Sequence, residues 1–128
     1  MDPKEIAKRL AEELSQKSQD EEEVERAIRE MSEAVIKDVI IFIDELDKWM
    51  KLKNIGSVER FYRVNVPDRM LEIELRILSL GREKSLRFGV QKTKIFVALK
   101  GENTKLQPSG PVYTQKQVID WISKQVMG

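Results

Sequence analysis

Cysteine and histidine are both absent from this chain of 128 residues. Without cysteine there is no disulfide, no thiolate metal site and no cysteine nucleophile. Without histidine, the commonest general base and the commonest metal ligand are missing as well. The remaining serines and tyrosines have no imidazole partner that could activate them. We therefore expect a protein that is not an enzyme and that needs neither a metal nor a cofactor.

Long apolar runs are also missing. The longest, Val39–Ile43, is five residues, far short of the roughly 20 that a membrane-spanning helix needs. The N-terminus has no signal-peptide pattern. Charged residues make up 35% of the chain, which is similar to the composition of proteins from hyperthermophiles. We expect a soluble, cytoplasmic protein with no membrane partner, from a thermophile.

The charge changes sign near Gly56. Residues 1–56 carry 10 basic and 15 acidic side chains, whereas residues 57–128 carry 13 basic and 7 acidic ones. A length of 128 residues with 41% hydrophobic content fits a single domain with one core. We expect residues 1–128 to form that domain, with an acidic helical part (1–56) and a basic part (57–128) made of a sheet and a C-terminal helix.

The acidic part has two helix signatures. Asp2 is a capping residue before Pro3 and Glu5, and an apolar stripe follows as far as Leu14, which predicts a short helix that ends before Ser15. Asp20 and Glu23 form a second capping box. We expect a long second helix from there to about Asn54, with Val39–Ile43 covered on all sides. A second subunit could supply part of that cover, so we expect a homo-oligomer.

The basic part alternates with a period of two, which is typical of strands. Phe61–Val66, Met70–Leu80, Ser85–Val90 and Lys94–Lys100 are separated by short turn segments, and this predicts a four-stranded antiparallel meander. Thr114 and Gln117 then cap a final helix. The predicted class is α+β, with two N-terminal helices of which the second is long, the meander and a C-terminal helix.

Alternation also sorts the strand residues into two faces. The apolar set faces the core: Tyr62, Val64, Val66, Leu71, Ile73, Leu75, Ile77, Leu86, Phe88, Val90, Ile95, Val97 and Leu99. The other set faces away: Phe61, Arg63, Asn65, Glu72, Glu74, Arg76, Arg87, Gly89, Lys94, Phe96, Ala98 and Lys100. Two aromatic rings among five cations are suited to single-stranded DNA or RNA, because bases stack on rings while cations contact phosphates.

The nucleic-acid hypothesis assigns a role to each of seven residues. Phe61 and Phe96 would stack on bases. Phosphates would be bound by five cations, namely Arg63, Arg76, Arg87, Lys94 and Lys100.

The layout resembles two known groups of proteins. Four antiparallel strands followed by a helix are similar to transcriptional coactivators of the positive-cofactor class, over about residues 57–128. Acidic helices before a basic sheet resemble the archaeal ThermoDBP-related single-strand-binding proteins, over most of the chain. The strand with Lys94, Phe96 and Lys100 and the helix Thr114–Val126 carry the resemblance. It implies a dimer or higher oligomer whose sheets and helices shape a groove for single strands.

Two alternatives stay open. Val39–Asp47 resembles the Walker B segment of AAA+ ATPases, in which Asp44 would bind magnesium and Glu45 would activate water. No phosphate-binding loop of the G-x-x-x-x-G-K-[ST] type occurs in the chain, so an exposed helix face is the preferred interpretation, also against a cation site at Asp38, Asp44 and Asp47. The second alternative is an assembly or adaptor protein that uses the long acidic helix and Val39–Trp49 for its contacts.

Overall fold

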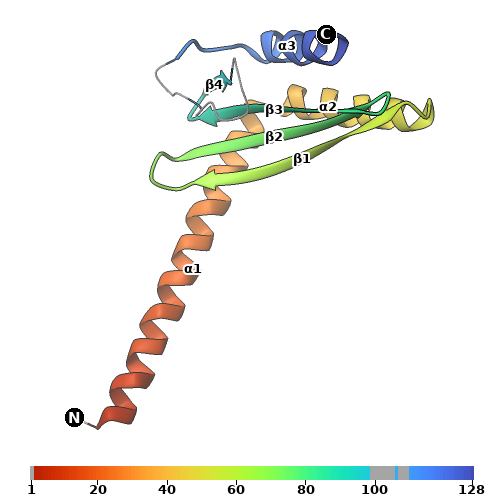
Figure 1. The fold of residues 1–128 in the computed structure, drawn as a ribbon. Helices are drawn as coiled ribbons and strands as arrows, with labels where there is room; N and C mark the ends of the chain where they lie inside the picture. The colour runs from red at the N-terminus through yellow and green to blue at the C-terminus, as the bar shows by residue number, and fades with distance from the viewer. Residues whose placement is uncertain (1, 99–105, 107–109) are drawn as a thin grey trace.

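The computed structural model describes residues 2–98, 106 and 110–128 of the chain. Two helices come first, a sheet follows and a third helix ends the chain (Figure 1). The elements are α1 (Pro3–Val35), α2 (Lys37–Leu52), β1 (Gly56–Asn65), β2 (Met70–Ser79), β3 (Arg82–Gln91), β4 (Lys94–Val97) and α3 (Gln115–Met127). This order confirms the predicted α+β class, with N-terminal helices, a meander and a C-terminal helix.

The two N-terminal helices are divided at Ile36, so the first of them is the long one. Asp2 accepts a hydrogen bond from the Lys4 amide at 3.1 Å and starts α1, as predicted. The predicted end before Ser15 and the predicted second start at Asp20 are wrong. That stretch contains neither glycine nor proline, and Gln16 donates to Asp20 at 3.1 Å one turn along the helix. Polar residues alone did not end the helix.

The break between α1 and α2 coincides with entry into the core. Ile36 has φ −109° and ψ 25°, which is outside the helical region, and its side chain is fully buried. Gln115, from the first turn of α3, accepts from the Asp38 amide at 2.7 Å and the Val39 amide at 3.3 Å. A side chain from the far end of the sequence therefore satisfies amides at the start of α2 that have no partner within that helix.

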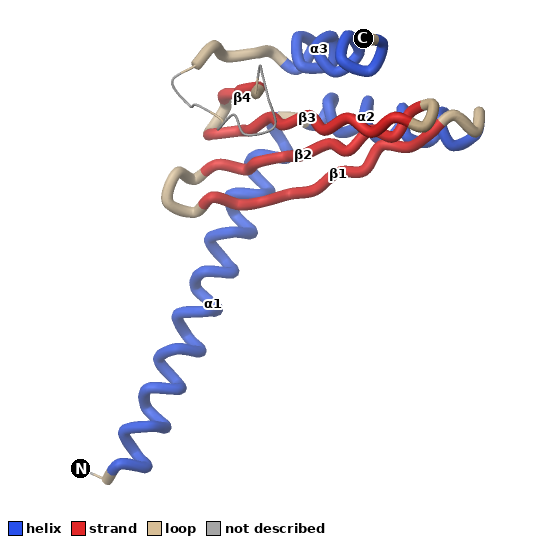
Figure 2. The backbone as a smooth tube through the Cα atoms, in the orientation of Figure 1, coloured by secondary structure: helices blue, strands red, loops and turns tan. Residues whose placement is uncertain are grey.

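The sheet is a meander in the order β1-β2-β3-β4, and all pairs are antiparallel (Figure 2). Its first three strands are each ten residues long, whereas β4 has four. Tyr113 adds an isolated bridge to Ile95. The prediction of a four-stranded antiparallel meander is confirmed.

One face of the sheet forms the core with the helices, as the alternation predicted. Ile36, Val39 and Ile43 and the α3 residues Val118 and Ile122 pack against this inner face. The buried strand residues of this face are Val58, Leu71, Ile73, Leu75, Ile77, Leu86, Phe88, Val90 and Ile95. On the edge strand β1, Tyr62 shares this face but stays exposed, and Leu99 lies outside the described residues.

The capping box predicted for the last helix is confirmed. Thr114 accepts from the Gln117 amide at 3.1 Å, and Gln117 accepts in return from the Thr114 amide at 2.8 Å. At the other end of α3, the Lys84 ammonium donates to the Gln125 carbonyl at 2.6 Å. The Lys84 contact ties the C-terminal end of α3 to β3, and the Gln115 contacts tie its first turn to α2.

The segment Val39–Ile43 is helical and only partly covered. Val39 and Ile43 are buried, whereas Ile41 is 53% exposed on the opposite side of α2. The prediction that this segment is covered all round is therefore wrong for the single chain. Its helical conformation confirms the preferred interpretation over a Walker B strand.

The long helix α1 leaves the folded body and projects away from it (Figure 1). Only Ile28 and Ser32, both near its C-terminal end, are buried, and every described residue from Pro3 to Ala27 is exposed. We call residues 3–27 the arm and residues 28–98, 106 and 110–128 the body. Among the described residues, no helix combines the length and apolar character that a membrane span needs.

Candidate nucleic-acid interface and assembly surface

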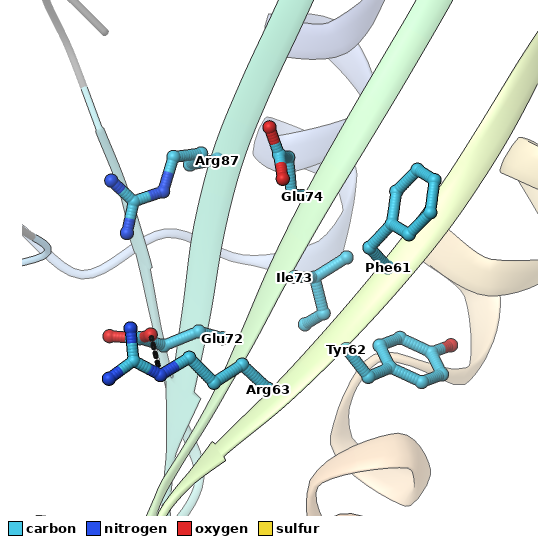
Figure 3. A pocket seen from close by; sticks show the side chains of 7 residues that line it. All are labelled: Phe61, Tyr62, Arg63, Glu72, Ile73, Glu74 and Arg87. Atoms are coloured by element: carbon cyan, nitrogen blue, oxygen red, sulfur yellow. Dashed lines mark ion pairs between the residues drawn. The ribbon is translucent and has the colours of Figure 1, made fainter. Parts of the chain in front are cut away.

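The outer sheet face is open, and an irregular hollow lies on it (Figure 3). The hollow has a volume of about 350 Å³. It is lined by Phe61, Tyr62, Arg63, Glu72, Ile73, Glu74 and Arg87. The structure therefore brings together three of the seven residues predicted to bind nucleic acid, and it places two carboxylates among them.

Phe61 already has a partner on its ring. The guanidinium carbon of Arg76 lies 4.5 Å from the centre of the ring, which is a cation–π contact. The Arg76 side chain also approaches Glu74, with 3.9 Å between nitrogen and oxygen. Phe61 is 39% exposed. A base that stacked on the covered side of Phe61 would have to displace Arg76 or stack upon its guanidinium plane.

The other arginines of this face are matched by glutamates. Arg63 pairs with Glu72 at 3.8 Å. In the register of β2 and β3, Arg87 lies opposite Glu74, which also accepts a hydrogen bond from Ser85 at 2.7 Å. Ion pairs between exposed side chains add little stability, but they do neutralise the local field. Positive potential at this face is lower than a count of arginines alone indicates.

Two glutamates on the outer face were missed from the sequence. We predicted that the first and third strands begin at Phe61 and Ser85, whereas β1 begins at Gly56 and β3 at Arg82. The longer strands add Glu59 and Glu83 to this face. Its charged side chains on the described strands are then four basic and four acidic, namely Arg63, Arg76, Arg87, Lys94, Glu59, Glu72, Glu74 and Glu83.

A base from solution cannot stack on Phe96, because this side chain is buried and only 1% exposed. It lies opposite Gly89, and the side chains of Leu106 and Met70 approach this glycine on the outer face. A Cβ added at Gly89 would lie 2.9 Å from Leu106 Cδ1 and 3.2 Å from Met70 Sδ. The predicted role of Phe96 is therefore wrong. Lys94 is exposed at the start of β4, and Lys100 lies outside the described residues.

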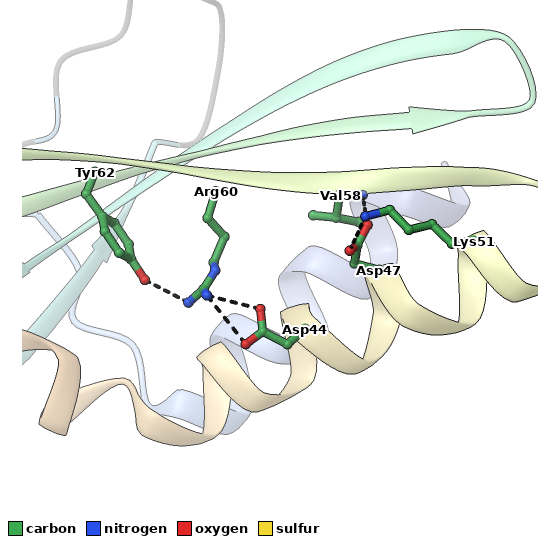
Figure 4. Close-up of polar contacts among 6 residues, drawn as sticks. All are labelled: Asp44, Asp47, Lys51, Val58, Arg60 and Tyr62. Carbon is green, nitrogen blue, oxygen red and sulfur yellow. Dashed lines mark hydrogen bonds and ion pairs between the residues drawn. The ribbon is translucent and has the colours of Figure 1, made fainter.

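The aspartates of the Walker B lookalike join α2 to β1 (Figure 4). Arg60 pairs with Asp44 at 3.2 Å and donates to the Tyr62 hydroxyl at 2.8 Å. Burial is the largest influence on Tyr62 and raises the pKa of its hydroxyl. Among the described residues no group of three carboxylates could hold a metal ion.

Asp47 has a structural role. It accepts from the Val58 amide at 2.9 Å and pairs with Lys51 at 2.8 Å. Burial alone would raise the pKa of its carboxyl, but the hydrogen bonds from Lys51 and Val58 and the charge of Lys51 outweigh burial and lower the pKa below its ordinary value. We predicted a solvated Asp47, and this is wrong because the side chain is partly buried against β1.

A second candidate surface runs along the arm. Leu10 is 55% and Leu14 is 59% exposed, and Ile6 and Val24 are exposed as well. Beyond the arm, Met31 is 68% exposed. The sequence signal for this surface was the apolar spacing of three and four residues, which resumes after the polar stretch Ser15–Gln19. We read that polar stretch as the end of a helix and so missed the continuity.

The chain was also compared with known proteins. No family model, no curated protein and no solved structure matches it.

Proposed function

We propose that this protein is an assembly protein, in which the arm of α1 joins the folded body to another protein chain. The proposal rests on one observation: a long helix with an apolar stripe that its own body does not cover. The arm makes up most of the 33 residues of α1, and all of its described side chains are exposed.

Two physical arguments support this proposal. Most of the stability of helices in proteins comes from packing of an apolar face rather than from helix propensity, and the body does not cover residues 3–27. The arm also keeps Ile6, Leu10 and Leu14 exposed on one side of the helix. Apolar side chains that recur at this spacing are typical of a helix that packs against a partner.

The arm is tested by measuring molar mass with light scattering after size exclusion. We expect the native chain to be larger than its monomer mass of 14.9 kDa. Leu10→Glu/Leu14→Glu should shift it to the monomer, because charges would then replace the apolar stripe. Ser15→Glu/Gln19→Glu is the matched control, since it adds the same charge on the opposite side of the same helix. Equal masses for both variants would contradict the proposal.

Single-stranded nucleic-acid binding on the outer sheet face is a second candidate. It is supported by the open face, on which Phe61 and Arg76 form a stacked pair beside Arg63 and Arg87. The four carboxylates on the same face oppose it. Binding would depend on contacts to the phosphates and on stacking of the bases, and it would have no sequence preference. The resemblance to ThermoDBP-related proteins, a cytoplasmic location and a thermophilic source remain predictions that accompany this candidate.

The second candidate is tested by fluorescence anisotropy of a labelled 20-nucleotide single strand, as DNA and as RNA, at two salt concentrations. We expect binding that weakens as salt rises, because phosphate contacts release counterions. Arg87→Glu/Lys94→Glu should abolish it, whereas Lys116→Glu/Lys124→Glu, which changes the same charge on α3, should leave most of it. Absence of binding at low salt would remove this candidate.

A further inference from the structure

The apolar stripe of α1 follows a heptad pattern along almost the whole helix, and within the arm all of its members are exposed. Positions spaced alternately by three and four residues define the seam of a coiled coil. In α1 the apolar members of this series are Ala7, Leu10, Leu14, Val24, Ile28, Met31 and Val35. The two positions left in the middle of the series are Lys17 and Glu21, one basic and one acidic.

These two charges distinguish between the orientations of a helix pair. Among the described residues, neither Lys17 nor Glu21 has an ion-pair partner within the single chain. A parallel pair in register would place Lys17 against Lys17 and Glu21 against Glu21. An antiparallel pair centred on residue 19 would place Lys17 of each chain against Glu21 of the other. Only the antiparallel arrangement brings opposite charges together at these seam positions.

The remaining charges of the helix favour the same orientation. Residues 3–18 carry four basic and three acidic side chains, whereas residues 20–35 carry two basic and seven acidic ones. A parallel pair would hold two strongly acidic segments side by side, and like charges at this distance repel. An antiparallel pair sets each acidic segment against the weakly basic one.

We infer that α1 pairs with α1 of a second copy of this chain, antiparallel and centred on residue 19, and this inference rests on the proposed function. Leu14 of one chain then packs against Val24 of the other. The seam meets the folded body at Ile28, which is 8% exposed. The two bodies therefore lie at opposite ends of the helix pair.

Disulfide trapping tests the register, because the native chain has no cysteine and any introduced thiol is the only one. We would mix Leu14→Cys and Val24→Cys chains, oxidise them and map the cross-link by mass spectrometry. The inference predicts a disulfide between position 14 and position 24 in the mixture. It predicts none for Leu14→Cys alone, since two copies of residue 14 would be about 15 Å apart along the helices.

A charge exchange gives a second measurement. Lys17→Glu should raise the dimer dissociation constant by about tenfold. The dimer contains two pairs of positions 17 and 21, and in each of them a glutamate would then face a glutamate. Lys17→Glu/Glu21→Lys should restore the native value, since the opposite charges face each other again. Helix content of each variant by circular dichroism at a dilution where only monomer remains controls for effects within one helix.

The outcomes separate this inference from the proposed function. A cross-link between two copies of position 14 would indicate a parallel pair and overturn the inference. A dimer that is lost with Leu10→Glu/Leu14→Glu, yet forms no 14–24 disulfide, would overturn the inference and leave the assembly arm in place. A native chain that stays monomeric, or a dimer that persists in Leu10→Glu/Leu14→Glu, contradicts both proposals.

Discussion

The arm and the body use the same apolar spacing with opposite results. In α2, Val39, Ile43 and Met50 recur at helical spacing and are buried beneath the sheet. In the arm, Leu10 and Leu14 recur at the same spacing and are exposed. An apolar stripe therefore predicts that a helix face is to be covered, but not whether the same chain covers it.

Charge differs between the two regions as well. In the body, Arg60, Lys51 and Arg63 are all matched by carboxylates of neighbouring elements or turns. In the arm, Lys17 and Glu21 lie on the apolar seam without an ion-pair partner among the described residues. These three cations of the body thus have a carboxylate partner in the single chain, whereas the proposed helix pair supplies the partners of Lys17 and Glu21 from a second copy.

The largest difference between body and arm is expected from a matched pair of alanine substitutions, one in each region. Ile43→Ala should lower the free energy of unfolding of the body by about 2 to 5 kcal/mol, because it leaves a cavity between α2 and the sheet. Leu14→Ala should change that free energy by less than about 0.5 kcal/mol, since the side chain is exposed in the single chain. Urea denaturation of each variant at a concentration where the chain is monomeric measures both. Equal losses would show that the arm packs on the body.

A substitution at Gly56 tests how closely the chain packs around the start of β1, which follows α2. The φ of Gly56 is +152°, and an added Cβ would lie 1.8 Å from the Leu78 carbonyl oxygen. Gly56→Ala should lower the free energy of unfolding by about 2 to 3 kcal/mol, measured by thermal unfolding. Gly81→Ala is the control, because Gly81 also has a positive φ but no atom within 4 Å of an added Cβ, and its cost should be about 1 kcal/mol. A larger cost at Gly81 would contradict this account.

Asp47→Ala removes the acceptor for the Val58 amide. It should lower the free energy of unfolding by about 1 to 2 kcal/mol at neutral pH. The pKa of Asp47 is lower in the folded chain than its ordinary value of 3.8. The carboxylate therefore stabilises the fold above that value, and this contribution declines as the pH falls through 3.8 toward the folded pKa. Urea unfolding of both proteins between pH 7 and pH 2.5 should show curves that converge in acid. A constant difference would contradict the role of the carboxylate.

The smallest effect is expected at the joint between Arg60 and Asp44. Both side chains are partly exposed, so Arg60→Ala should cost no more than about 1 kcal/mol. The measurement is again urea unfolding, with Arg69→Ala in the β1–β2 turn as the control. A loss as large as that of Ile43→Ala would show that polar contacts, rather than the apolar core, hold α2 on the sheet.

Local signals in the sequence predicted the elements that local chemistry determines. The cap at Asp2, the box at Thr114 and Gln117, and the alternation from Leu71 to Ile77 all appear where they were expected. Contacts between distant segments could not be predicted in this way. Leu106 comes to lie over Gly89, and no pattern near Phe96 indicates that it will be buried.

The candidate site was predicted less well than the fold, for a physical reason. Its charge balance depends on where each strand begins, and alternation does not define the first residue of a strand. Glu59 and Glu83 lie just outside the strands predicted from periodicity, yet they face outward beside Arg76 and Leu78 in the sheet. The helix break shows the same limit, because it coincides with the burial of Ile36 and with no glycine or proline.

Amide hydrogen exchange of residues 6–18 as a function of protein concentration tests the central claim most directly. If the arm is covered by a second copy, its amides should be protected at high concentration and should lose that protection on dilution, while amides of β2 stay protected throughout. Rapid exchange of the arm at every concentration, or protection that does not change with dilution in a monomeric chain, would contradict it.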